Sequence, residues 1–240
     1  MPPRLFVDLP LRAGDPFSLP PGPARHVQVL RLQPGAPLTL FDGAGGEWDA
    51  TVVQMGRSDV SVQLGEHRAA DRELPLQVTI ALGMPANERM DAVVEKATEL
   101  GVAVIQPLIC ERSVLRLSGE RAQKKVAHWQ AVAVSACEQS GRTRVPKVAE
   151  VLALTSWLQS LTAPSSRWVL SLRDARPVAA MATPAGELLC LSGPEGGLSP
   201  GEEAAAVTAG FAAISLGARV LRADTAPLAL LAHLGLRTGA

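Results

Sequence analysis

The chain has 240 residues, 47% of them hydrophobic, and it carries 23 basic and 23 acidic residues. This composition can fill a core and excludes a disordered chain, and the neutral charge weighs against a strongly basic nucleic-acid binder. The three cysteines lack metal-ligand spacing, so we expect buried thiols in a reducing compartment. We find no apolar signal segment and no run long enough to span a bilayer, and we therefore expect a cytoplasmic protein.

The first 70 residues are predicted to form a small β-barrel domain. Short β-type runs are expected at 4–7, 37–41, 47–53 and 59–64, with a glycine-rich turn at 42–46. Several short strands at this spacing are typical of a small barrel. A proline-rich loop is expected at 16–23, and the polar segment 65–74 is predicted to be a linker.

Residues 74–240 are predicted to form a second, α/β domain. Strands are expected at 76–82, 102–109 and 168–172, and helices at 88–100, 119–139 and 151–161. A basic loop, residues 140–146, ends the second of these helices. Alternating strands and helices indicate a mostly parallel sheet with helices on both faces.

The strongest local pattern lies in residues 188–226. A short apolar strand at 188–191 runs into the sequence Gly193-Pro194-Glu195-Gly196-Gly197, and Ser199, Pro200 and Glu202 then form a capping box that should begin a helix ending at Gly210. A second strand, 212–216, ends at Gly217. The loop 218–224 leads to a last helix, 225–234, which we expect Gly235 to end.

These two glycine-marked strand ends predict a pocket. Ligands of open α/β sheets bind at the carboxyl ends of the strands, and a pocket built from main chain and apolar side chains suits a flat nucleoside. The alternative is that the glycines only form tight connections. The polar cluster that follows the second strand, Arg219, Arg222, Asp224 and Thr225, favours a ligand site.

Residues 192–199 (SGPEGGLS) and 215–226 (SLGARVLRADTA) resemble the C-terminal signature of the RsmE family. Segments 88–91, 96–101, 111–113 and 138–146 match the same family in order. The resemblance implies a SPOUT-class methyltransferase domain with a trefoil knot, preceded by a PUA-like RNA-binding domain. It also implies a homodimer that uses S-adenosylmethionine to methylate N3 of a uridine in 16S ribosomal RNA, met in an assembled small ribosomal subunit.

The cofactor site follows from the pattern and the resemblance together. We expect the cofactor to be bound by residues at the ends of three strands and in the loops after them: Leu172, Leu191, Ser192, Gly193, Glu195, Gly196, Gly197, Leu216, Gly217, Leu221, Arg222, Thr225 and Ala226.

Methylation at uridine N3 requires loss of a proton, and two kinds of side chain would assist it. A carboxylate could accept the proton, with Glu195 or Asp224 as candidates. A guanidinium could stabilise the charge on the uracil oxygens, with Arg222 or Arg144 as candidates. We expect Arg222 and Glu195 to be catalytic, and Arg222 is a stronger candidate than any single carboxylate. Helix capping alone would explain Asp224, where the family usually has Glu.

RNA contacts are expected from Arg4, His26 and Arg31 in the first domain and from Arg142 and Arg144 in the basic loop. Each could instead be an ordinary surface residue, which is the favoured interpretation of His26 taken alone. No dinucleotide or P-loop motif is present, and the scattered histidines predict no metal site. Two other functions remain open: a methyltransferase of the same fold with another target base, and a non-catalytic RNA-binding protein.

Overall fold

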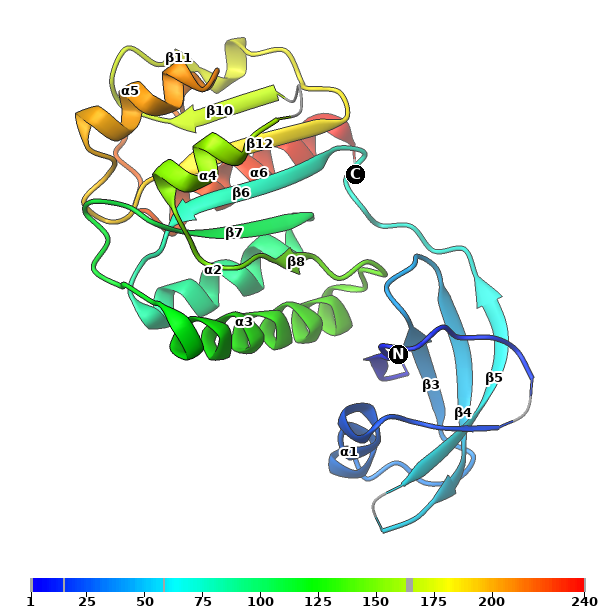
Figure 1. Ribbon diagram of the computed structural model, residues 1–240. Helices are drawn as coiled ribbons and strands as arrows, with labels where there is room; N and C mark the ends of the chain where they lie inside the picture. The colour runs from blue at the N-terminus through cyan, green and yellow to red at the C-terminus, as the bar shows by residue number, and fades with distance from the viewer. Residues whose placement is uncertain (1, 15, 58, 163–165, 240) are drawn as a thin grey trace. The chain divides into compact units, whose positions relative to one another are not determined.

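The computed structural model describes residues 2–14, 16–57, 59–162 and 166–239. The chain divides into two compact units, shown in Figure 1. Unit 1 contains Met1–Glu73 and Cys137–Val145, and unit 2 contains Leu74–Ala136 and Pro146–Ala240. Segment 137–145, which the sequence-based division assigns to the second domain, thus groups with the first unit.

Unit 1 is a five-stranded sheet with one helix. Its strands follow the spatial order β1-β3-β4-β5-β2, in which β1 runs parallel to β3 and the other pairs are antiparallel. The core joins valines and leucines of the strands to Ala24 and Val27 of the helix. The elements are β1 (Arg4–Phe6), β2 (Phe17–Ser18), α1 (Pro21–Val29), β3 (Pro37–Phe41), β4 (Glu47–Met55) and β5 (Val60–Arg68).

Two expectations for unit 1 are corrected by the sheet. The segment predicted to be a linker begins within β5, which continues to Arg68. Arg68 lies opposite Glu47 in the antiparallel register, and its Nη2 is 3.2 Å from Glu47 Oε1 and 2.9 Å from Asp49 Oδ1. Oppositely charged cross-strand neighbours stabilise such polar strand ends. The proline-rich segment also contains the short strand β2, which pairs with β5.

Unit 2 is an eight-stranded sheet flanked by helices, and every pair of strands that the structure describes in it is parallel. The parallel α/β expectation is therefore confirmed. The elements are β6 (Gln77–Gly83), α2 (Asn87–Glu99), β7 (Val104–Ile109), α3 (Gly119–Ser140), β8 (Lys147–Val148), β9 (Leu152–Ala153), α4 (Leu154–Ser160), β10 (Ser166–Leu170), β11 (Arg176–Pro177), η1 (Val178–Ala180), β12 (Glu187–Ser192), α5 (Pro200–Thr208), β13 (Ala212–Ser215) and α6 (Thr225–Thr238).

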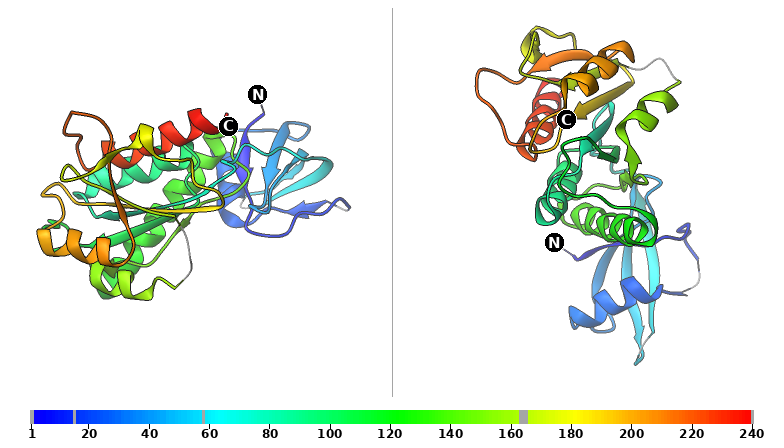
Figure 2. Two further views of the ribbon diagram at one scale, coloured as in Figure 1. Left: turned by 90° about the horizontal axis from the view of Figure 1, so that it is seen from above. Right: turned by 60° about the vertical axis from the view of Figure 1, so that its left-hand side comes forward.

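Helices cover both faces of this sheet. Figure 2 shows α6 on one side of the strands and α5 on the other. Trp157 of α4 and Ala206 of α5 share a buried cluster with Leu108, Val169 and Leu191 of the strands. Strand β12 lies between β6 and β10, so the chain returns to the middle of the sheet after forming both neighbours. The trefoil knot implied by the resemblance stays a prediction.

Some predicted boundaries in unit 2 are wrong for reasons of pairing and packing. The helix expected from 151 begins at Leu154, because Leu152 and Ala153 pair with β7. The last helix does not end at Gly235 but continues to Thr238, and Gly239 ends it with a φ of 71°. Added at Gly235, a Cβ would lie 3.6 Å from Leu74 Cδ2, so this glycine packs against a neighbour.

The short strands β8 and β11 escaped sequence analysis because two residues show no periodicity. Strand β10 ends at Leu170, two residues before the predicted end of that strand. Within the described residues, none of the helices has the length and apolar character that a membrane-spanning segment needs.

Candidate functional site

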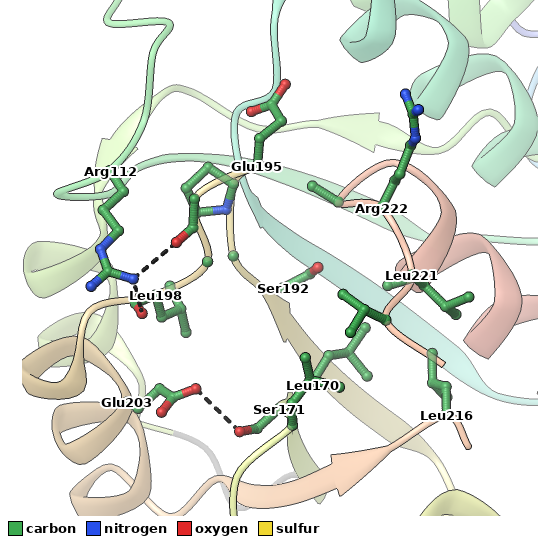
Figure 3. Close-up of a pocket in the computed structure, with 18 of the residues that line it drawn as sticks. Arg112, Leu170, Ser171, Ser192, Glu195, Leu198, Glu203, Leu216, Leu221 and Arg222 are labelled. Atoms are coloured by element: carbon green, nitrogen blue, oxygen red, sulfur yellow. Dashed lines mark hydrogen bonds between the residues drawn. The ribbon is translucent and has the colours of Figure 1, made fainter. Parts of the chain in front are cut away.

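A pocket of about 530 Å³ opens at the carboxyl ends of β10, β12 and β13 (Figure 3). This volume is within the usual range for small-molecule sites. Its walls come from three segments, 170–173, 192–198 and 214–226, with Arg89, Arg112 and Glu203 added from other elements. The pocket therefore lies at the edge of the sheet where the sequence placed it.

Most of the predicted cofactor-binding residues line this pocket. Leu191 does not: it is fully buried in the core between the strands and α4 and α5. Gly217 and Thr225 are also absent from the wall, although their neighbours belong to it. The lining residues that were predicted are Leu172, Ser192, Gly193, Glu195, Gly196, Gly197, Leu216, Leu221, Arg222 and Ala226.

Residues 193–198, which we name the glycine loop, close tightly on themselves. A Cβ added to Gly193 would lie 2.7 Å from the Leu198 nitrogen and 2.9 Å from the Gly197 carbonyl carbon. Added to Gly83 at the end of β6, it would lie 2.5 Å from Pro194 Cδ. Only glycine fits where main chain approaches this closely. The loop is thus a compact cradle supported by the neighbouring strand end.

The helix that follows the glycine loop begins as predicted. Ser199 Oγ accepts a hydrogen bond from the Glu202 nitrogen at 3.2 Å, and Glu202 Oε2 accepts one from the Ser199 nitrogen at 2.8 Å. This reciprocal pair is the predicted capping box of α5. It fixes the point at which the glycine loop ends.

Glu195 fastens the glycine loop to the start of α2. Its Oε1 accepts a hydrogen bond from the Ala86 nitrogen at 3.0 Å and lies 3.6 Å from Arg89 Nη1. Ala86 is the N-cap residue of α2, which has no side-chain cap of its own. The Glu195 carboxylate therefore satisfies a donor at that helix start, where negative charge is favoured.

Arg222 extends from the edge of the pocket (Figure 3). It is exposed, and its guanidinium makes no hydrogen bond or ion pair within the part of the chain that the structure describes. The carbonyl of Arg222 accepts hydrogen bonds from the Thr225 and Ala226 nitrogens, each at 3.0 Å. The main chain is thus fixed by the start of α6 while the side chain stays available to a ligand.

The capping explanation for Asp224 is wrong. This residue precedes α6, but its side chain makes no cap hydrogen bond. Its φ of −75° and ψ of −33° are helical, whereas a capping residue normally has extended angles that turn its side chain toward the next nitrogens. Asp224 also does not line the pocket.

Several pocket residues were missed by sequence analysis. Arg112 donates from Nη1 to the Gly196 oxygen at 2.9 Å and to the Leu198 oxygen at 3.3 Å. Ser171 donates from Oγ to Glu203 Oε1 at 3.1 Å. Arg89 and Arg112 lie in segments 88–91 and 111–113, where motif matches were present but suggested no role.

The residues predicted to contact RNA divide into two groups. Arg4 and Arg142 are largely enclosed: Arg4 pairs with Glu47 and donates from Nη2 to the Arg142 oxygen at 3.0 Å. Arg142 pairs with Glu73, to which its Nε donates at 2.9 Å. The exposed members are His26, Arg31 and Arg144. The buried arginines hold unit 1 together, and only the exposed side chains are open to an RNA.

Burial makes the cysteines poor nucleophiles. It raises the pKa of the Cys110 and Cys137 thiols to about 12 and also raises the pKa of Cys190, so thiolate is scarce near neutral pH. Among the described residues, no group of three His, Cys, Asp or Glu side chains is placed to hold a metal ion. The polar groups that line the pocket come from main chain, arginines, the carboxylates of Glu195 and Glu203, and the hydroxyls of Ser171 and Ser192.

Comparison with known proteins agrees with this geometry. Residues 72–235 match the family model of an RNA methyltransferase domain, and residues 24–65 match that of an RNA methyltransferase PUA domain. The chain is 34% identical to ribosomal RNA small subunit methyltransferase E of Synechocystis sp. over 86% of this chain and 68% of that protein.

Two solved structures cover nearly the whole fold. The ribosomal RNA small subunit methyltransferase E of Neisseria gonorrhoeae, bound to S-adenosyl methionine, is 37% identical, with a TM-score of 0.94 over 99% of this chain and 98% of that one. A Legionella pneumophila protein in complex with SAM is 31% identical, with the same TM-score and coverage. The expected SPOUT-type fold and family resemblance are confirmed, and the chain belongs to the RNA methyltransferase family of the ribosomal RNA small subunit methyltransferases E.

Proposed function

We propose that this enzyme transfers the methyl group of S-adenosylmethionine to N3 of a uridine in 16S ribosomal RNA. The observation that supports this most is the main-chain cradle of the glycine loop beside the exposed Arg222, in a chain of this family. Methyl transfer needs alignment of the reacting groups more than a special nucleophile. A pocket walled by main chain and apolar side chains, with the exposed arginines Arg219 and Arg222 in its lining, meets that need.

The residues present fit the cofactor. The pocket offers apolar surface from Leu170, Leu216 and Leu221 for a flat adenine ring, and main-chain groups of the glycine loop for its polar atoms. Gly196 keeps the cradle clear, since a Cβ there would lie 3.0 Å from Arg112 Cβ. When bound, S-adenosylmethionine supplies a methyl group activated by a sulfonium.

Arg222 and Glu195 would serve the target base. Arg222 is proposed to stabilise negative charge on a uracil oxygen as the N3 proton leaves. Glu195 is the weaker candidate for that proton, because its Oε1 is already bound to the Ala86 nitrogen. Its Oε2 makes no hydrogen bond within the described residues and is the atom that would accept the proton.

The RNA would be held by exposed residues of unit 1. His26, Arg31 and Arg144 are open to solvent and carry the donors that phosphates accept from. We also propose a homodimer that acts in the cytoplasm on an assembled small subunit. A preformed particle offers shape as well as charge, which suits a chain with no net charge.

The reaction is tested by incubating the protein with radiolabelled S-adenosylmethionine and either unmodified small ribosomal subunits or naked 16S rRNA. The RNA is digested and the labelled nucleoside identified. We expect label in N3-methyluridine, and more of it from the subunits. Label in another nucleoside would show that the enzyme methylates a different base. The absence of label despite cofactor binding would indicate an RNA-binding role without catalysis.

Arg222→Ala should lower kcat by roughly a hundredfold to a thousandfold, the usual effect of removing a donor to a developing anion. Cofactor affinity measured by calorimetry should change much less. Arg121→Ala, an exposed arginine on α3, is the matched control. Unchanged turnover in Arg222→Ala would remove Arg222 from the mechanism.

A further inference from the structure

The glycine loop and the first turn of α5 are bound by one short segment that follows β7, residues 110–113. This segment has no assigned role, and its residues are far from the loop in sequence. Its Arg112 side chain donates hydrogen bonds to two carbonyl oxygens of the loop, and its Glu111 nitrogen donates one to the Glu202 carboxylate of α5.

Arg112 supplies the first half of the contact. Its Nη1 donates to the Gly196 oxygen at 2.9 Å and to the Leu198 oxygen at 3.3 Å, as the dashed lines in Figure 3 show. One guanidinium nitrogen thus holds two carbonyls on either side of Gly197. Gly197 has a φ of 67°, a left-handed backbone angle that favours glycine.

Glu202 supplies the second half. Its Oε2 accepts from the Ser199 nitrogen at 2.8 Å, as a capping box requires, and its Oε1 accepts from the Glu111 nitrogen, also at 2.8 Å. The side chain is almost fully buried, with 6% exposed. Capping of α5 accounts for the hydrogen bond to only one of the two carboxylate oxygens, Oε2. The second oxygen joins the start of α5 to the segment that carries Arg112.

The anchoring segment is itself rigid. Ser113 Oγ accepts a hydrogen bond from the Cys110 nitrogen at 3.0 Å, and the Ser113 nitrogen donates to the Cys110 oxygen at 3.1 Å. Arg116 Nη2 donates to the Glu111 oxygen at 2.8 Å. A support with its own hydrogen bonds can restrain a glycine-rich loop, whose conformational entropy is otherwise large.

We propose that Arg112 and Glu202 are positioning residues that together hold the glycine loop in its cofactor-binding conformation. We name the pair the loop clasp. The proposal rests on the proposed function of the pocket as the S-adenosylmethionine site. Holding the main chain in advance raises affinity, because binding then loses less conformational freedom. Glu202 does not line the pocket, so its effect on the cofactor must pass through the loop.

The test compares Arg112→Ala, Arg112→Lys and Glu202→Gln with the parent protein. Arg112→Ala and Glu202→Gln should each raise the Kd for S-adenosylmethionine by roughly tenfold to a hundredfold, the usual effect of losing a charge-assisted hydrogen bond. At saturating cofactor kcat should fall by less than about threefold, so that the loss appears in KM. Arg112→Lys keeps a donor and should recover part of the affinity.

Hydrogen exchange gives a measurement that does not depend on the cofactor. In both clasp variants the amides of Glu111, Gly197 and Ser199 should exchange roughly tenfold faster or more, while those of β6 and β7 stay protected. Arg121→Ala and Glu120→Gln, exposed residues of α3 with the same chemistry, are the controls and should change affinity by less than about twofold. The loss of cofactor binding free energy in the double variant should be smaller than the sum of the losses in the two single variants, since both residues hold one loop.

Two results would overturn the loop clasp: cofactor affinity within about twofold of the parent in Glu202→Gln, or unchanged amide exchange in the loop. If the parent protein itself fails to bind S-adenosylmethionine, the proposed function fails, and the exchange data still decide whether the clasp restrains the loop. If Arg112→Ala does not fold, Arg112→Lys and Glu202→Gln carry the same comparison.

Discussion

Two loops of this chain are held by arginine and glutamate side chains, but in different ways. The basic loop is fixed in unit 1 by a buried ion pair of its own, Arg142 with Glu73, and Arg4, which is paired with Glu47, donates to the Arg142 oxygen. The glycine loop of unit 2 is fixed by charged side chains that bind main-chain N–H and C=O groups. The basic loop thus contributes one side chain to a buried ion pair, whereas the glycine loop is held chiefly by hydrogen bonds between charged side chains and main-chain groups.

The difference indicates what each loop is for. Paired buried charges specify one arrangement of the chain, but each becomes costly when its partner is lost. Charges bound to main-chain groups fix the backbone of a loop without a second buried charge. The first arrangement suits a structural joint, and the second suits a site that must bind a nucleoside through its backbone.

The basic loop also shows that local charge alone does not identify an RNA contact. Residues 111–147 contain an excess of basic residues, which is compatible with phosphate binding or with a solvated helix face. In the structure Arg142 is 4% exposed and Arg144 is exposed, although they are two residues apart. The buried partner of Arg142, Glu73, and not the local composition, decides that this arginine is enclosed while Arg144 meets solvent.

The largest effect is expected where a buried pair is broken. Glu47→Gln leaves Arg4 with an uncompensated charge, because the Glu47 side chain is 4% exposed and that of Arg4 is 10% exposed. Unit 1 should lose about 3–5 kcal/mol of unfolding free energy, measured by denaturant titration with hydrogen exchange in β3 to β5. Cofactor binding should be retained.

The matched control is Asp49→Asn, which breaks a pair between exposed side chains, Arg68 and Asp49. Its cost should be about 1 kcal/mol or less. Equal losses in Glu47→Gln and Asp49→Asn would contradict the view that burial makes the first pair structural.

A smaller effect is expected from crowding the glycine loop. Gly193→Ala would place a Cβ 2.7 Å from the Leu198 nitrogen, so the main chain must move. Overpacking of this kind costs about 1–3 kcal/mol, or roughly tenfold to a hundredfold in Kd. Calorimetry with S-adenosylmethionine measures the loss. Gly201→Ala, where a Cβ meets only Ser199 Oγ at 3.8 Å, should bind normally, and equal losses in both variants would argue against a cradle of main chain.

The smallest effect is expected in how the stability of unit 1 depends on pH. Burial alone would raise the pKa of Glu47, but hydrogen bonds from Arg4 and Arg72 outweigh burial and lower it below 4.5. The unfolded chain then binds the proton more readily, so the stabilisation is present above about pH 4.5 and is lost as pH falls through the lowered pKa. Burial raises the pKa of Glu138, which therefore contributes the opposite slope.

The measurement is the difference in unfolding free energy between the parent protein and Glu47→Gln across this range. The difference should shrink as the solution is acidified, because protonated Glu47 resembles the amide. A difference that stays constant down to about pH 3 would mean that Glu47 is not the titrating group.

Local patterns in the sequence determined the framework of the pocket. The capping box of Ser199 and Glu202, the glycine loop and the apolar strand ends follow from short-range rules of backbone geometry and periodicity. They placed the candidate site at residues 188–226, and most of the residues predicted from the pattern and the resemblance together line the pocket. The identity of the cofactor and the type of reaction were predicted from the resemblance to a methyltransferase family.

Only the tertiary structure decided which charged residues face a ligand and which hold the fold. Arg4 binds a carbonyl 138 residues away, and Arg112 binds one 84 residues away. The orientation of Glu195 toward Ala86, 109 residues distant, likewise depends on strand order. Hydrogen-bond partners at such separations are selected by sheet topology and packing, which no local pattern of residues specifies.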